Sequence, residues 1–188
     1  MNKRDGSPLL IATNNKGKLA EFHELLDDLG IQLVTPSQIG LDLDVIEDGA
    51  TYAENAAKKA TAFAGASGLI SLADDSGLEV DALGGAPGLY SARYGSSPSL
   101  PPNPQYLGGA GGGRLSDGER RKYLLGKLQT SPRPWTARFR AVIAIAIPET
   151  LWNQAARRLN LREQARVTIT EGICEGEIIP EERGTGGF

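Results

Sequence analysis

Two adjacent carboxylates, Asp74 and Asp75, are the residues of this chain with the clearest capacity for chemistry. They follow the apolar run Leu69–Ala73 and precede Ser76 and Gly77, so we expect a strand that delivers both acids to a loop. Neighbouring strand side chains point to opposite faces, which predicts different roles for the two acids. One role would be to hold Mg²⁺, which binds one or two carboxylates together with substrate phosphates. The alternative is an ordinary Asx-type turn, which is common for such a sequence.

A second set of residues could hold an anion. The polar segment 13–18 lies between a short apolar run and a helical pattern, and it contains Lys16 and Lys18. Backbone N–H groups and the helix dipole attract phosphate at such a helix N-terminus. Lys59 is a further candidate phosphate contact, and Glu47 lies in an acidic loop that could fold back to a metal. The alternatives are an ordinary strand–helix turn, solvated lysines and a solvent-facing acidic loop.

Taken together, these residues predict a hydrolase that cleaves a phosphoanhydride bond. Lysines would hold a triphosphate, and Mg²⁺ on carboxylates would neutralise charge and lower the pKa of a bound water. A carboxylate beside the metal would orient or deprotonate the attacking water.

Composition limits the setting in which this chemistry takes place. The chain has 188 residues and a net charge of −3, so no overall basic field favours nucleic acid or an anionic membrane. Its single cysteine, Cys174, rules out an intrachain disulfide and suits a reducing compartment. The longest apolar run, Ala141–Ile147, is too short to cross a bilayer. We therefore expect a cytoplasmic protein without a membrane partner. The only histidine, His23, falls beside the apolar stripe of a helix and is read as a surface or half-buried residue.

Hydrophobic periodicity supplies the elements that must position these residues. Capping boxes at Thr51–Glu54 and Ser116–Glu119 mark two helix starts. The Pro- and Gly-rich segment 95–114 predicts a flexible insertion inside a single domain, 1–188. The full pattern predicts strands at 9–13, 31–34, 69–73, 138–147, 166–170 and 174–179, and helices at about 19–29, 52–64, 116–128 and 149–159. This order predicts an α/β fold with a mixed sheet, partly antiparallel late in the chain.

The chain resembles the non-standard purine nucleoside triphosphate pyrophosphatases, also called inosine triphosphate pyrophosphatases. The resemblance extends from the first strand to the last residue. Its motifs are Thr13–Lys18, Glu54–Ala60, Ala73–Leu78, Val80–Leu83, Gly85–Tyr94, Ala137–Phe139, the Glu-Gly pairs at 171–172 and 175–176, and Gly184–Phe188.

The resemblance implies an elongated mixed β-sheet flanked by helices, with two lobes around a nucleotide cleft, usually in a homodimer. It implies Mg²⁺-dependent hydrolysis of ITP, dITP and XTP to the monophosphate and pyrophosphate, which removes these nucleotides from the pool. Asp75 would accept a proton and bind the metal, Glu47 would be the second ligand, and Asp74 would support the metal site. The substrate contacts that it implies are Thr13, Asn14, Asn15, Lys16, Gly17, Lys18, Lys59, Ser76 and Phe188.

The sequence departs from the family pattern at its end. The family continues with Gly-Tyr-Asp-Pro and later a Ser-His-Arg segment that contacts the base, whereas this chain stops at Phe188. We therefore expect a domain that is incomplete at its C-terminus, and weak or no turnover of ITP by this exact chain.

Two other functions remain open at this stage. The related septum-formation-type nucleotide pyrophosphatases share the fold, but Asn15 and Lys18 argue against them. A nucleotide- or metal-binding protein without catalysis is the other.

Overall fold

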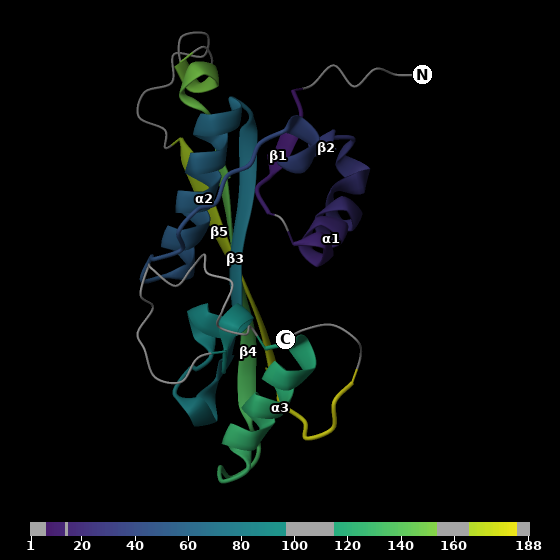
Figure 1. Cartoon of the computed structure of the whole chain (residues 1–188), viewed down its shortest axis with the longest axis vertical. Helices are drawn as coiled ribbons and strands as arrows, with labels where there is room; N and C mark the ends of the chain where they lie inside the picture. The colour runs from purple at the N-terminus through teal and green to yellow at the C-terminus, as the bar shows by residue number, and fades with distance from the viewer. Residues whose placement is uncertain (1–6, 14, 97–114, 154–165, 184–188) are drawn as a thin grey trace. The chain divides into compact units, whose positions relative to one another are not determined.

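The structure is a computed structural model of the chain, and it describes residues 7–13, 15–96, 115–153 and 166–183. Its centre is a five-stranded sheet in the order β2-β1-β3-β4-β5 (Figure 1). The strands are β1 Leu9–Ile11, β2 Leu33–Val34, β3 Ile70–Val80, β4 Thr136–Ala146 and β5 Val167–Glu177. The helices are α1 Lys16–Leu26, α2 Tyr52–Ser67 and α3 Asp117–Leu128, and the short 3₁₀ helices are η1 Asp27–Leu29, η2 Ser37–Ile39, η3 Asp81–Leu83 and η4 Gly88–Arg93.

The chain divides into two compact units that share the long strands. Unit 1 comprises Met1–Asp74 and Val142–Thr170, and unit 2 comprises Asp75–Ala141 and Glu171–Phe188. The acid pair at 74–75 therefore falls on the boundary between the units. The nucleotide cleft implied by the resemblance stays a prediction.

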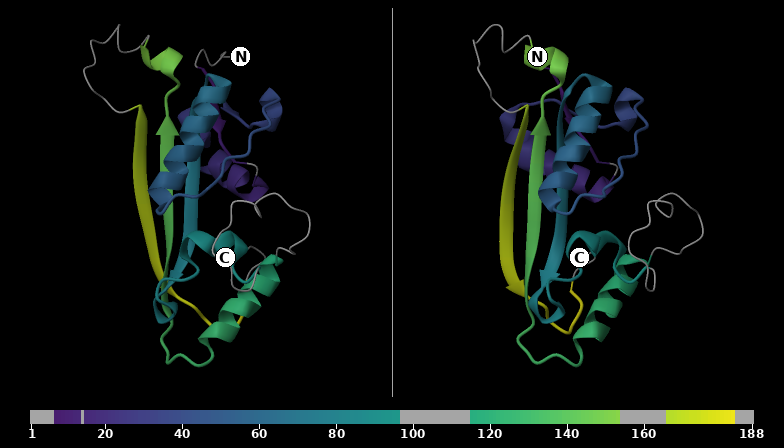
Figure 2. Two further views of the ribbon diagram at one scale, coloured as in Figure 1. Left: turned by 60° about the vertical axis from the view of Figure 1, so that its left-hand side comes forward. Right: turned by 90° about the vertical axis from the view of Figure 1, so that its left-hand side faces the viewer.

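The sheet mixes parallel and antiparallel pairs, as the sequence predicts. Strand β1 is parallel to both β2 and β3. Strand β4 lies between β3 and β5 (Figure 2). Ile147 N–H donates to the Arg166 carbonyl at 2.9 Å near one end of the β4–β5 pair, and Ile178 N–H donates to the Trp135 carbonyl at 2.9 Å near the other. From the second contact to the first, residue numbers increase in β4 and decrease in β5, so these two strands are antiparallel.

Two strand predictions are wrong. The expected loop after Ala73 does not form, because β3 continues from Ile70 through both acids and Gly77 to Val80. β3 pairs with β1 only at Ile70–Leu72, and its other neighbour in the sheet is β4; this pairing keeps the segment extended and outweighs the turn preference of Asp-Asp-Ser-Gly. Likewise, the two strands expected at 166–170 and 174–179 are the single strand β5.

Unit 1 is organised around β1 and α2. Leu10 and Ile11 are fully buried, and α2 buries the side chains of Ala56, Ala60 and Phe63. The expected start of α2 is confirmed, because Thr51 Oγ1 accepts a hydrogen bond from Glu54 N–H at 3.1 Å. The apolar stripe predicted on α1 is only partly buried: Leu25 and Leu29, at the end of that segment, are 73% and 62% exposed. His23 is exposed, as expected.

Unit 2 has its own hydrophobic cluster beneath α3. The cluster is formed by Leu78, Val80, Leu124, Leu128, Trp135 and Ala137. Helix α3 begins with the predicted capping box, in which Ser116 and Glu119 each satisfy the other's backbone N–H. The predicted insertion at 95–114 lies outside the described residues except for 95 and 96, and of the predicted helix at 149–159 only residues 149–153 are described and helical. Among the described helices, none has the length and apolar character needed to cross a membrane.

We predict that Leu128→Ala lowers the free energy of unfolding of unit 2 by about 2–5 kcal/mol, because Leu128 is fully buried and its truncation leaves a cavity. The chain has two tryptophans, so a Trp152→Phe background leaves Trp135 of the same cluster as the fluorescent reporter during denaturant unfolding. The exposed Lys122→Ala is the matched control. Equal losses for the two variants would contradict the assignment of this core.

Candidate functional site

The first element of the site is the loop that precedes α1. Asn15 is the N-cap of this helix, and its Oδ1 accepts hydrogen bonds from Gly17 N–H at 2.9 Å and Lys18 N–H at 3.4 Å. Asn15 N–H in turn donates to Thr13 Oγ1 at 3.2 Å. Two of the backbone donors expected to face an anion are thus engaged by Asn15. Among the described side chains of this segment, the Lys18 ammonium is the positive group.

Lys18 forms an ion pair with the carboxylate of Asp74. The Asp74 side chain is 8% exposed, while that of Lys18 is 29% exposed. A carboxylate with so little access to water is costly to leave without a positive partner. Lys18 therefore balances the charge of the first acid of the pair.

A second lysine–carboxylate pair lies at the start of α2. Lys59 Nζ is 3.2 Å from Glu47 Oε1, and the Lys59 side chain is only 13% exposed. Glu47 belongs to the irregular segment 41–50 that leads into α2. Two of the lysines expected to bind phosphate, Lys18 and Lys59, are thus paired in unit 1 with carboxylates expected to serve a metal.

The segment that carries Glu47 is fastened to α2 by contacts that the sequence analysis did not identify. Gly49 N–H donates to Asn55 Oδ1 at 2.8 Å, and Asn55 is only 3% exposed. Ala50 N–H donates to Glu54 Oε2 at 2.7 Å. A buried asparagine needs a polar partner. The asparagine among the alanines of this helix was therefore the feature of the sequence that could have indicated the contact with Gly49.

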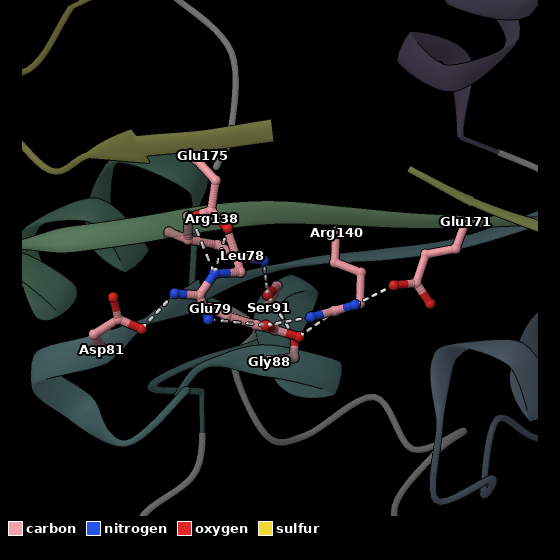
Figure 3. Close-up of polar contacts among 9 residues, drawn as sticks. All are labelled: Leu78, Glu79, Asp81, Gly88, Ser91, Arg138, Arg140, Glu171 and Glu175. Atoms are coloured by element: carbon pink, nitrogen blue, oxygen red, sulfur yellow. Dashed lines mark hydrogen bonds and ion pairs between the residues drawn. The ribbon is translucent and has the colours of Figure 1, made fainter. Parts of the chain in front are cut away.

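Asp75 and Ser76 belong to unit 2 and lie on β3 directly after Asp74. Asp75 is 7% exposed and Ser76 is half-buried. Adjacent strand residues alternate in direction, so Asp74 and Asp75 point to opposite faces, as predicted. Two residues further on, Leu78 N–H donates to Ser91 Oγ at 2.9 Å, which connects the strand to η4 (Figure 3).

Beyond the acid pair, charged side chains cross from β3 to β5 within unit 2 (Figure 3). Arg140 Nε donates to Glu79 at 2.8 Å and its Nη1 pairs with Glu171. Arg138 Nη2 donates to Asp81 at 2.7 Å and its Nε lies 3.2 Å from Glu175. Arg138 is thus an ion-paired residue. These contacts connect neighbouring strands and fix their register.

The same side chains shift one another's proton affinity. The Thr136 hydroxyl, which donates to Asp81 at 2.6 Å, and the Arg138 guanidinium lower the pKa of Asp81, while Glu175 and Asp81 raise the pKa of Arg138. A lowered carboxyl pKa contributes stability above the pKa of the unfolded chain. That contribution is lost as pH falls through the folded pKa, so these contacts weaken only in acid.

The candidate metal ligands suit Mg²⁺ in chemistry. Glu47, Asp74 and Asp75 offer only carboxylate oxygens, the hard donors that this cation prefers. Within the described residues, no group of three or more His, Cys, Asp or Glu side chains could hold an ion. A metal site made by Glu47, Asp74 and Asp75 therefore stays a prediction. Of the remaining predicted contacts, Asn14, Phe188 and the side chain of Lys16 lie outside the described residues.

These features define an α/β protein with a mixed five-stranded sheet, two lysine–carboxylate pairs in unit 1 and a buried acid pair on β3. The chain belongs to the Ham1 family, whose model matches residues 9–188. A curated relative from Desulforamulus reducens, named dITP/XTP pyrophosphatase, is 43% identical over 181 residues, which is 96% of this chain and 75% of the relative.

Solved structures agree with this assignment. A HAM1 protein from Coxiella burnetii superposes on this chain with a TM-score of 0.71 at 34% sequence identity. The superposition covers 97% of this chain and 78% of the Coxiella chain. The Staphylococcus aureus Ham1 protein superposes with a TM-score of 0.67 at 32% sequence identity, over 96% of this chain and 77% of the Staphylococcus chain. The α/β mixed-sheet fold predicted from the sequence is therefore confirmed.

We predict that Lys18→Met lowers the free energy of unfolding by about 1–3 kcal/mol, because it leaves a buried carboxylate without its positive partner. Lys58→Met is the matched control: Lys58 also pairs with a carboxylate, that of Asp48, but this one is 60% exposed. Exposed pairs contribute less than about 1 kcal/mol. Denaturant unfolding of both variants measures the difference, and a loss from Lys58→Met as large as that from Lys18→Met would refute it.

Proposed function

We propose that this chain hydrolyses the non-standard purine nucleoside triphosphates ITP, dITP and XTP to the monophosphate and pyrophosphate, and so removes them from the nucleotide pool. Membership of the Ham1 family, with 43% identity to a relative named dITP/XTP pyrophosphatase, is the observation that carries the proposal. The chemistry of the site supports it, because lysines suited to phosphate occur beside carboxylates suited to a hard cation.

The ion pairs explain how such a site can accept its ligand. Lys18 is paired with Asp74, and Lys59 with Glu47. A magnesium triphosphate brings a cation for the carboxylates and a polyanion for the lysines. Both pairs can then exchange partners together. An uncompensated buried charge would cost several kcal/mol, and this exchange leaves none.

Within this proposal each residue has a role. Glu47 and Asp75 hold Mg²⁺ with Asp74 in support, and when bound the ion neutralises phosphate charge and lowers the pKa of its water. Asp75 accepts the proton of the attacking water. Lys18 and Lys59 bind phosphate oxygens, the Thr13–Lys18 loop surrounds the triphosphate, and Ser76 contacts the substrate.

A homodimer in the cytoplasm completes the proposal. The single cysteine favours a reducing compartment. The homodimer is proposed from the family resemblance, and Phe139 and Ile173 of unit 2, which are 43% and 49% exposed, are candidates for its interface.

We expect the chain to release pyrophosphate from XTP or ITP in the presence of Mg²⁺, and Asp75→Asn to slow that release by about 10²–10⁴-fold, because the amide cannot accept the proton. Single-turnover assays with enzyme in excess measure slow release as well as fast. Asp48→Asn, in the exposed pair with Lys58, is the control and keeps the original rate.

The products separate this proposal from its alternatives. Release of orthophosphate alone would contradict it, and so would unchanged turnover by Asp75→Asn. A protein that binds nucleotide without catalysis would release no pyrophosphate under single-turnover conditions. A preference for canonical or pyrimidine triphosphates over XTP and ITP would favour the septum-formation type of enzyme.

A further inference from the structure

The segment that carries Glu47 has no regular secondary structure, yet its end is held tightly. Residues 41–49 form neither helix nor strand, so no backbone ladder fixes Glu47. Its position depends instead on the point where this segment meets α2. The buried contact at that point is the hydrogen bond from Gly49 N–H to Asn55 Oδ1, at 2.8 Å.

The contact between Gly49 and Asn55 leaves no free space. A Cβ added to Gly49 would lie 2.7 Å from Asn55 Oδ1 and 2.8 Å from Glu54 Cβ. Real Cβ atoms essentially never approach other heavy atoms so closely, so the backbone reaches the helix here only because residue 49 is glycine. Asn55 itself is 3% exposed, and packing therefore restricts the direction of its amide.

Two of the restraints on Glu47 involve residues of the proposed site or its buried support. One is the hydrogen bond between Asn55 and Gly49, two residues beyond Glu47 in the chain. The other is the ion pair with Lys59, which lies one helical turn after Asn55 on α2. In the proposed function Lys59 turns to the phosphates, and the ion pair is then lost. The contacts of its neighbours with α2 then hold the Glu47 carboxylate in place: Gly49 with Asn55, Ala50 with Glu54 and Asp48 with Lys58. Among these partners Asn55 is buried, whereas Glu54 and Lys58 are exposed, so the bond to Asn55 is the one that packing holds in a fixed direction.

We propose that Asn55 is a positioning residue: through Gly49 it holds Glu47 where its carboxylate can bind the metal of the substrate complex. This inference rests on the proposed function, since it assigns Asn55 to the ligand role of Glu47. Groups that orient metal ligands commonly contribute about 10–100-fold in metal affinity.

Direct metal binding tests the proposal. Mn²⁺ is titrated by electron paramagnetic resonance in the presence of saturating ITP with a methylene group between its α- and β-phosphorus, which cannot be hydrolysed there. Asn55→Ala and Gly49→Ala should each raise the Mn²⁺ Kd by about 10-fold or more. Asp48→Asn, next to Glu47 but paired at the surface with Lys58, should stay within about two-fold of the unmodified chain.

A double-variant cycle separates positioning from general structural damage. If Asn55 acts through Glu47, Asn55→Ala should add little to the loss already caused by Glu47→Gln. Hydrogen exchange of the Gly49 amide should also quicken in Asn55→Ala, because its acceptor is gone. If Asn55→Ala melts below the assay temperature, Gly49→Ala carries the same test.

The outcomes distinguish the metal role of Glu47 from the positioning role of Asn55. An unchanged Mn²⁺ Kd in Glu47→Gln would refute the metal role of Glu47 and, with it, this inference. Weakened binding in Glu47→Gln with unchanged binding in Asn55→Ala and Gly49→Ala would refute the role of Asn55 alone. Full additivity of Asn55→Ala with Glu47→Gln would also overturn it, because the asparagine would then act independently of Glu47.

Discussion

The burial of charge is the constraint on which this structure depends. Asp74 lies in the middle of a central strand with its side chain 8% exposed, and such a carboxylate requires a positive partner. Lys18 supplies that partner from the first turn of α1. Glu47 and Lys59 repeat the arrangement at α2, with a lysine that is itself 13% exposed. The site proposed for a metal–phosphate complex therefore carries balanced charges of its own, and in the proposal the ligand replaces them.

The surrounding elements hold these charges at defined positions. The helix cap made by Asn15 sets the first turn of α1, and Lys18 with it. The bond from Gly49 to Asn55 sets the end of the Glu47 segment. Within unit 2, the arginines of β4 connect β3 to β5 and fix the register of the strand that carries Asp75. Charge and backbone geometry are thus determined by the same few contacts.

The sequence predicted the parts that depend on local patterns. Helix starts at Thr51 and Ser116 are short-range signals, and both are confirmed. The length of β3 was missed, because Asp-Asp-Ser-Gly favours a turn locally while pairing with strands far apart in the chain keeps it extended. The contact between Gly49 and Asn55 was missed because it joins an irregular segment to a helix and follows no period. The lysine pairs could not be predicted for the same reason: the partners of Lys18 and Asp74 are set by tertiary structure.

The exchange of partners at the two lysines is the central claim of this account. The nuclear magnetic resonance signals of ¹⁵N-labelled lysine side chains report it directly, assigned by single Lys→Arg variants and recorded before and after addition of Mg²⁺ and the α,β-methylene analogue of ITP. The account predicts that the signals of Lys18 and Lys59 both move on ligand binding while that of Lys58 stays in place. Binding of the analogue with the signals of Lys18 and Lys59 unmoved would contradict it, because both lysines would then remain with their carboxylates.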